Sequence, residues 1–227
     1  MQQTLCSNSG EPNLAVVRII DSKQHSFLCT GTVIAPMYVM TAAHCLKNVN
    51  HVSIQTSKGV QDVDHRNFHT HHSYKTKEDL QFDIAILKTV TTMGVKPVNL
   101  CPLTKVDHKQ MHSHHVVGYG DHGCRDKQWK ANMNITGGSK CNYSDEHYYC
   151  ARSAGAGGHV CKGDSGGPLL AKVAEKKGSK HRLYQIGITI ARSDSACDIN
   201  SLFLRIDVHR KWIEKIIGGI NICSIQK

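Results

Sequence analysis

Short runs of aliphatic and β-branched residues recur along the chain, and turn-forming residues separate them. The runs cover residues 14–20, 32–34, 52–55, 84–88, 115–117, 168–173 and 183–190. Runs of this length between clusters of Gly, Pro, Asn and Ser are typical of β-strands. Because the rhythm persists along most of the chain, it predicts an all-β protein.

One segment near the end carries helical spacing instead. Its apolar side chains fall on one helix face, and they are Val208, Trp212, Ile213, Ile216 and Ile217. Asp207 stands where a capping residue begins a helix, and Gly218-Gly219 stand where a helix ends. The pattern therefore predicts a single C-terminal helix.

The size and composition are those of an ordinary globular protein. The chain has 227 residues, of which 40% are hydrophobic and 20% charged. This length suits one large β unit or two small domains that share a cleft. No apolar run approaches the ~20 residues that a membrane-spanning helix needs, so we expect no membrane partner.

The chain is basic, with a formal net charge of +10. Its densest cluster of positive side chains lies between two predicted strands and comprises Lys172, Lys176, Lys177, Lys180, His181 and Arg182. Such a charge attracts polyanions, but a solvated hairpin tip explains this cluster better than a glycosaminoglycan site does. No nucleic-acid-binding motif accompanies the charge, so we expect no nucleic-acid partner.

Ten cysteines in a chain of this size indicate an oxidising compartment. Zinc is the competing interpretation, but the cysteines are dispersed and form no paired CxxC clusters. Two glycosylation sequons, Asn134-Ile135-Thr136 and Asn142-Tyr143-Ser144, agree with a secreted, extracellular glycoprotein. The segment after Met1 has no apolar region of a signal peptide. We therefore expect that a presequence has been removed or that the start is truncated.

Two groups of histidines have the spacing of metal ligands. They are His69, His71 and His72, and separately His112, His114 and His115. Surface histidines explain them better than a zinc or copper site does, although that alternative stays open. We therefore expect no metal and no cofactor.

Three short motifs supply the candidate chemistry. Ser165 lies between glycines in Gly163-Asp164-Ser165-Gly166-Gly167-Pro168, His44 lies in Thr41-Ala42-Ala43-His44-Cys45, and Asp83 precedes the apolar run 84–87. A serine is a weak nucleophile unless a base accepts its proton and a third group orients that base. The order His, Asp, Ser along the chain supplies a base, an orienting carboxylate and a nucleophile.

With these flanking residues, the chain resembles the trypsin/chymotrypsin family of serine peptidases over about residues 14–218. The resemblance implies one peptidase domain over residues 1–227. It would consist of two six-stranded antiparallel β-barrels and a C-terminal helix. The first barrel would lie within about residues 14–100, and the second, with the helix, within 101–227.

The resemblance also implies a role for each motif residue. His44 takes the proton of Ser165 and returns it to the leaving amine, while Asp83 holds the imidazole in one tautomer. The backbone N–H groups of Gly163 and Ser165 form an oxyanion hole. The implied activity is hydrolysis of peptide bonds by a secreted, monomeric serine endopeptidase. Its partners would be protein or peptide substrates and protease inhibitors.

The expected substrate pocket departs from the trypsin pattern. His159, followed by Val160, stands six residues before Ser165, where trypsin-like members have an aspartate. A preference for Arg or Lys is therefore not expected. One pocket wall reads Ile190-Ala191-Arg192, or Thr189-Ile190-Ala191 if the register slips by one residue, and the opposite wall has Ser201. An inward Arg192 would narrow the pocket or favour an acidic residue, whereas an outward Arg192 would favour a medium apolar side chain.

The resemblance further implies three cysteine pairs, which are Cys29 with Cys45, Cys161 with Cys197, and Cys141 with Cys150. The pairing of Cys6, Cys101, Cys124 and Cys223 is open, and a bond between Cys6 and Cys101 is one alternative.

The sequence contains no Ile-Val-Gly-Gly. In the family, the new ammonium of that terminus pairs with the buried aspartate beside the nucleophile, here Asp164. A buried carboxylate without a partner is costly, so Asp164 is expected to find another one. Two functions stay open, an active endopeptidase and a catalytically silent binding or regulatory protein on a protease scaffold. The intact His44, Asp83 and Ser165 favour the enzyme.

Overall fold

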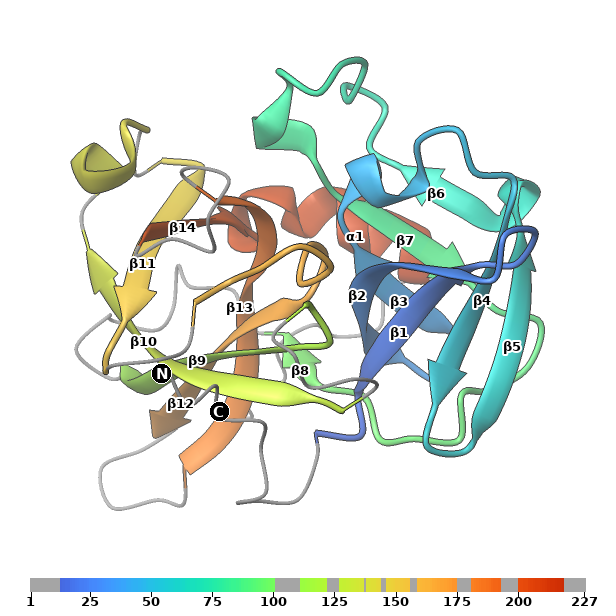
Figure 1. The fold of residues 1–227 in the computed structure, drawn as a ribbon, viewed down its shortest axis with the longest axis horizontal. Helices are drawn as coiled ribbons and strands as arrows, with labels where there is room; N and C mark the ends of the chain where they lie inside the picture. The colour runs from blue at the N-terminus through green and yellow to red at the C-terminus, as the bar shows by residue number, and fades with distance from the viewer. Residues whose placement is uncertain are drawn as a thin grey trace.

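The computed structural model describes residues 13–100, 111–121, 127–136, 138–143, 146–155, 159–174, 181–192 and 200–218. Nearly all of its regular structure is β-strand, arranged as two seven-stranded sheets followed by one α-helix (Figure 1). The prediction of an all-β protein with a C-terminal helix is confirmed.

The first sheet has the strand order β5-β4-β1-β2-β3-β7-β6. Its strands are β1 (Val16–Asp21), β2 (Ser26–Ala35), β3 (Tyr38–Thr41), β4 (His51–Thr56), β5 (Gly59–Asp64), β6 (Phe68–Thr70) and β7 (Ala85–Lys88). Three short 3₁₀ turns interrupt the connections, at η1 (Ala43–Leu46), η2 (His65–Asn67) and η3 (Leu80–Phe82). All the pairings between these strands are antiparallel, and the sheet forms a half-barrel.

The second sheet has the order β12-β9-β10-β11-β14-β13-β8, and an added β12–β13 pairing closes six of its strands into a barrel. Its strands are β8 (Asn99–Leu100), β9 (Met111–Gly118), β10 (Trp129–Thr136), β11 (Tyr148–Ser153), β12 (Pro168–Ala174), β13 (His181–Arg192) and β14 (Asn200–Arg205). A further 3₁₀ turn, η6 (Gly138–Cys141), precedes β11. The short β8 pairs in parallel with β13.

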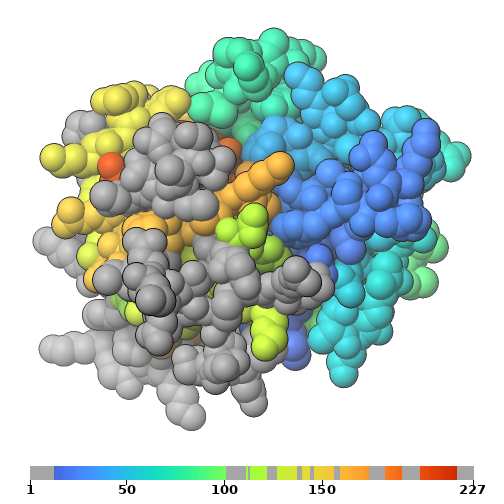
Figure 2. All heavy atoms as spheres, viewed as in Figure 1, coloured from blue at the N-terminus to red at the C-terminus, as the bar shows by residue number. Residues whose placement is uncertain are grey.

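The buried apolar side chains form two main clusters. The larger one includes Ile19, Ile54 and Leu87 of the first sheet and extends to residues of the second sheet, such as Leu204. The other lies within the second sheet and includes Leu169, Ile186 and Phe203. In the space-filling view the residues of the first sheet, in blue to cyan, gather on one side and those of the second on the other (Figure 2). The two sheets therefore pack against each other through apolar side chains of the larger cluster.

The C-terminal helix differs in its start from the prediction. The helix α1 (Arg210–Ile217) follows the 3₁₀ turn η7 (Asp207–His209), and Gly218 ends it in the left-handed conformation with φ of 73°. Asp207 makes no capping hydrogen bond and instead accepts from Arg205, at 2.6 Å from Nη2 to Oδ2. Val208 lies in this 3₁₀ turn rather than in the helix, and it is 42% exposed. Ile213 and Ile217 do pack into the first core.

The expectation of surface histidines was wrong for two of them. His71 and His115 are buried, with 7% and 5% of their surface exposed. His71 stacks on Phe82 with 4.9 Å between ring centroids, and the Trp212 ring lies tilted against it at 5.3 Å. His115 lies on β9, where the alternation of the strand turns it inward. Both rings therefore serve as core residues.

The predicted basic hairpin lies partly outside the described residues. Its flanking strands β12 and β13 do pair, with Ala174 opposite His181, while residues 175–180 fall outside. Among the described helices, none is long and apolar enough to cross a membrane.

Candidate active site

His44 lies in the 3₁₀ turn η1, directly after strand β3. A disulfide between Cys29 and Cys45 joins this turn to strand β2, which is the pairing that the resemblance implied. Its neighbours Ala43 and Cys45 are buried, whereas the His44 side chain is 31% exposed. The turn is therefore anchored on both sides while its imidazole reaches a solvent-accessible cavity.

Asp83 follows the 3₁₀ turn η3 and is 1% exposed. Both of its carboxylate oxygens face His44. The imidazole Nδ1 lies 2.6 Å from Oδ2, and the backbone N–H of His44 donates to Oδ1 at 2.8 Å. These two contacts fix the position and orientation of the imidazole, and they leave Nε2 as the ring nitrogen that faces away from Asp83.

Ser165 lies in a tight turn whose shape requires glycine. Gly163 and Gly166 have φ of 95° and 80°, a region that residues with a Cβ rarely adopt. A Cβ at Gly163 would also collide with the ring of Phe27. The turn is tied to strand β2, since Thr30 N–H donates to the Ser165 carbonyl at 3.0 Å and Thr30 Oγ1 donates to the Gly163 carbonyl at 2.9 Å.

Two backbone N–H groups of this turn are available to a ligand. Within the part of the chain that the structure describes, neither Gly163 N–H nor Ser165 N–H donates to an acceptor of the protein. Both residues line the same cavity as His44. The turn thus presents two donors beside a hydroxyl, the arrangement that stabilises a developing oxyanion.

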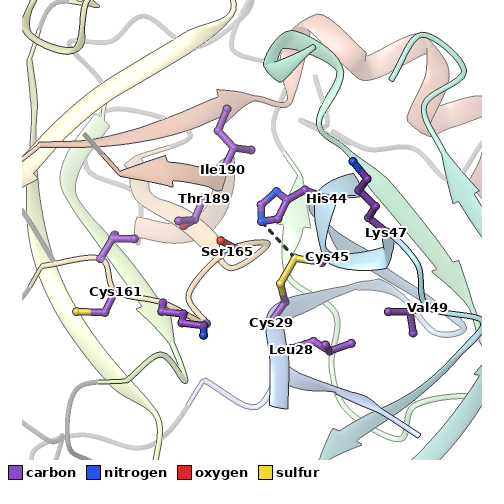
Figure 3. Close-up of a pocket in the computed structure, with 13 residues that line it drawn as sticks. Leu28, Cys29, His44, Cys45, Lys47, Val49, Cys161, Ser165, Thr189 and Ile190 are labelled. Atoms are coloured by element: carbon purple, nitrogen blue, oxygen red, sulfur yellow. Dashed lines mark hydrogen bonds between the residues drawn. A yellow bond between two sulfur atoms is a disulfide. The ribbon is translucent and has the colours of Figure 1, made fainter. Parts of the chain in front are cut away.

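The cavity lies between the two sheets and measures about 510 Å³ (Figure 3). Its lining residues are Leu28, Cys29, His44, Cys45, Lys47, Val49, Val160, Cys161, Lys162, Gly163, Ser165, Thr189 and Ile190. Of the expected pocket residues, Val160 and Ile190 therefore line it, whereas His159 and Ser201 do not. Ala191 and Arg192 belong to β13, but their side chains lie outside the described part of the structure.

Ser165 and His44 both line this cavity and lie side by side (Figure 3). No hydrogen bond joins Ser165 Oγ to the imidazole among the described residues. The Nε2 atom instead lies 3.8 Å from Cys45 Sγ. Contacts between nucleophile and base are commonly long in ligand-free sites and shorten when a substrate binds.

Asp164 is fully buried, and its carboxylate accepts hydrogen bonds from groups other than a chain terminus, as expected from the sequence. Oδ1 accepts from Gly120 N–H at 2.7 Å and from the Trp129 indole N–H at 2.5 Å, while Oδ2 accepts from Cys161 N–H at 2.8 Å. Buried charged groups are tolerated when they are fully hydrogen-bonded. These donors therefore account for a carboxylate in the protein interior.

Further disulfides lie near the site. Cys141 is bonded to Cys150, and Cys161 is also disulfide-bonded. The expected partner of Cys161, Cys197, lies outside the described residues, as do Cys6, Cys101, Cys124 and Cys223.

One set of metal-ligand side chains clusters among the described residues, and it comprises Cys29, His44 and Cys45. The two cysteine sulfurs are bonded to each other, so they are not thiolate ligands. The predicted histidine groups do not form a comparable cluster in the described ranges.

The fold agrees with comparisons to known proteins. The model of the Trypsin family matches residues 6–213, so this chain belongs to the trypsin family of serine proteases. Members of this family act on protein substrates.

Three relatives illustrate the similarity. Coagulation factor XI of Bos taurus is 28% identical over 182 residues, covering 67% of this chain and 28% of the relative. The CLIP domain-containing serine protease HP8 of Bombyx mori is 28% identical, and the match covers 89% of this chain and 65% of the relative. The serine protease grass of Drosophila melanogaster is 24% identical, and the match covers 90% of this chain and 64% of the relative. The chain thus spans less than two thirds of the length of these relatives.

Sequence reasoning missed several residues of the site. Lys47 and Lys162 place two exposed ammonium groups on the cavity walls, and no lining residue is acidic. Thr30 and Trp129 contact the nucleophile turn from strands far away in sequence. Lys47 and Lys162 each stand three positions from His44 or Ser165, so their nearness to the site could have been predicted from the sequence. No neighbouring residue in the sequence indicated the contacts of Thr30 and Trp129.

Proposed function

We propose that this chain is a secreted serine endopeptidase that uses His44, Asp83 and Ser165 as its catalytic triad. The observation that carries the proposal is the 2.6 Å contact between His44 Nδ1 and Asp83 Oδ2, in a cavity that Ser165 also lines. This contact leaves Nε2 as the base for the serine proton.

In the first half of the reaction, Ser165 Oγ attacks the carbonyl carbon of the scissile peptide bond. Its proton passes to Nε2 of His44, and the carbonyl oxygen becomes an oxyanion. The N–H groups of Gly163 and Ser165 stabilise this charge. When the C–N bond breaks, His44 gives the proton to the leaving amine, and an ester of Ser165 with the acyl half of the substrate remains.

In the second half, a water molecule gives a proton to His44 and attacks the ester carbon. The new oxyanion occupies the same two N–H groups. Its collapse breaks the ester bond, His44 returns the proton to Ser165 Oγ, and the carboxylic acid product leaves. Asp83 stabilises the imidazolium that forms in each half.

The walls beside Ser165 support a preference for a medium apolar side chain at the scissile bond. Val160 and Ile190 narrow the cavity with branched side chains and offer no charge. His159 stands in the sequence where trypsin-like members have the aspartate at the bottom of the substrate pocket. Its Nδ1 is buried and has no hydrogen-bond partner among the described residues. Apolar walls discriminate among apolar substrates by only about 1–3 kcal/mol per methylene, so we expect a graded rather than a strict selectivity.

Secretion is supported by the disulfides and by the two sequons. Asn134 and Asn142 are both exposed, as a glycosylated asparagine must be. The relatives support the activity but not a particular substrate, because the chain covers only part of their length.

Hydrolysis of a library of internally quenched peptides tests the proposal. We expect cleavage after Val, Leu or Met in preference to Arg or Lys, and its loss in Ser165→Ala. A folded, disulfide-bonded wild-type protein that cleaves nothing in the library would instead support the silent, protease-like binding protein. Cleavage after Arg or Lys would refute the proposed selectivity alone.

A further inference from the structure

The carboxylate of Asp164 occupies a space from which side chains are excluded. Gly118 and Gly120 flank it at the end of strand β9. A Cβ at Gly120 would come within 2.5 Å of the carboxylate, and one at Gly118 would collide with Oδ1. The absence of side chains at both positions therefore lets the carboxylate reach the interior of the second barrel.

The indole of Trp129 meets the carboxylate in this space. Trp129 begins strand β10 and pairs directly with Gly118 on β9. Its side chain is 2% exposed, and its N–H donates to Asp164 Oδ1 at 2.5 Å. Because the ring packs within the second core, its N–H is held in one direction. Such a donor is preorganised, and a hydrogen bond to a carboxylate is among the stronger kinds.

Asp164 stands between Gly163 and Ser165, two residues that line the cavity and whose N–H groups donate to no acceptor among the described residues. Its own N–H donates to Cys161 at 3.1 Å, and its carbonyl accepts from Gly167 N–H at 2.9 Å. Fixing the side chain therefore limits rotation of the Asp164–Ser165 peptide unit, which carries the Ser165 N–H, and it also holds the adjoining residue Gly163 in place from its C-terminal side. On the other side of the turn, Thr30 holds the carbonyls of Gly163 and Ser165.

We propose that Trp129 is a positioning residue for the oxyanion hole. Its indole N–H, together with Gly120 N–H and Cys161 N–H, holds Asp164 so that Gly163 N–H and Ser165 N–H point into the cavity. The chain thus carries within its own second barrel a donor for the carboxylate beside the nucleophile. This inference rests on the proposed serine peptidase function, because it concerns the stabilisation of the same oxyanion.

Two pairs of matched variants test it. Trp129→Phe keeps an aromatic ring and removes the N–H, and Trp212→Phe makes the same change at the other tryptophan of the chain. Gly118→Ala places a methyl group between the indole and the carboxylate, whereas Gly155→Ala adds one where nothing lies within 4 Å. We expect Trp129→Phe and Gly118→Ala to lower kcat, and the rate of fluorophosphonate labelling of Ser165, by about tenfold or more, with KM changed by less than about threefold. The two control variants keep wild-type rates.

Equal rates in Trp129→Phe, Trp212→Phe and wild type would overturn the proposal. A fall in the melting temperature of Trp129→Phe matched by a rise in KM and an unchanged kcat would also overturn it, because that is the result of a merely structural role.

A second measurement does not depend on activity. In ¹⁵N-labelled protein, the backbone N–H resonances of Gly163 and Ser165 should shift or broaden in Trp129→Phe and Gly118→Ala, and stay in place in Trp212→Phe and Gly155→Ala. If Trp129→Phe and Gly118→Ala show these shifts but the wild-type protein is not labelled by the fluorophosphonate, the proposed function is contradicted and the role of Trp129 stands. Unchanged resonances in all four variants would overturn the role of Trp129 whether or not the protein is active.

Discussion

The hydroxyl of Thr30, on strand β2 of the first sheet, donates a 2.9 Å hydrogen bond to the carbonyl of Gly163, which lies 133 positions further along the chain. The same hydroxyl accepts from the N–H of Tyr119 at 3.1 Å. One buried side chain therefore joins the first sheet, the end of β9 and the nucleophile turn. The two halves of the molecule are held together at the point where the candidate chemistry occurs.

Replacing Thr30 tests the importance of that link. Thr30→Val removes both hydrogen bonds and leaves Tyr119 N–H and the Gly163 carbonyl without these partners, which typically costs about 1–3 kcal/mol. We expect a lower melting temperature and a reduced kcat. Thr32→Val is the matched control, because the hydroxyl of Thr32 is buried without a hydrogen-bond partner among the described residues. A loss of stability and of kcat in the control equal to that in Thr30→Val would refute this account.

The contact between Asp83 and His44 predicts a large kinetic effect with little structural change. Asp83→Asn preserves the shape of the side chain but turns an N–H toward the imidazole, which favours the wrong tautomer. We expect kcat to fall by about 10⁴-fold at neutral pH. Steady-state kinetics on the best library peptide, beside circular dichroism of the variant, measures this. A fall of less than about tenfold in a folded variant would mean that Asp83 does not orient the base.

Lys47 and Lys162 predict a preference for acidic residues beside the scissile bond. Both ammonium groups are exposed on the cavity wall, so their effect should weaken as salt screens them. We expect kcat/KM for peptides with flanking Glu or Asp to exceed that of neutral peptides at low salt. The advantage should disappear at about 0.5 M salt and in the double variant Lys47→Gln, Lys162→Gln. An advantage that survives both changes would have another origin.

Two buried histidines predict a loss of stability on acidification. Burial lowers the pKa of His115 to about 3, assisted by the charges of Lys130, Lys172 and His114. Burial likewise lowers the pKa of His209 to about 4, with His71 next in importance and a hydrogen bond from its ring to the Gln81 backbone opposing the shift. Both rings therefore stay neutral in the folded protein at pH values where they are charged in the unfolded chain.

The sign of this effect follows from proton binding. Between the unfolded pKa of about 6.5 and the folded values, the unfolded chain binds more protons, so stability falls as the pH falls. At pH 5 each ring should cost about 2 kcal/mol relative to neutral pH. Urea unfolding of Ser165→Ala at pH 7 and pH 5 measures it. The same protein with His115→Gln and His209→Gln should lose most of this difference, and an unchanged difference would assign it to other groups.

The fold could be predicted from the sequence because its signals are local. Short aliphatic and β-branched runs mark half of the described strands, and the glycines around Ser165 mark a turn whose φ of 95° and 80° favours glycine. The three motifs were likewise readable because each combines a reactive residue with neighbours that shape its own turn.

The features that could not be predicted from the sequence depend on contacts between segments that are distant along the chain. Trp129 lies 35 residues from Asp164, and nothing beside it indicates that its N–H meets a carboxylate. His71 follows a short strand, yet Trp212 and His209 from the C-terminal segment cover it. Asp207 stands at a position in the sequence where a helix cap is expected, but its carboxylate accepts hydrogen bonds from Arg205 instead. In each case a tertiary partner overrides the local pattern.

The most direct test of the central claim is covalent labelling of Ser165 by a fluorophosphonate, with the modified peptide identified by mass spectrometry. In this reaction the serine oxygen forms a bond to phosphorus, fluoride leaves, and His44 takes the proton. The account predicts one label per molecule, on Ser165, which is lost in Ser165→Ala and slowed in Asp83→Asn. Absence of labelling in folded, fully disulfide-bonded protein would contradict the account and identify the chain as a trypsin-family protein without peptidase activity.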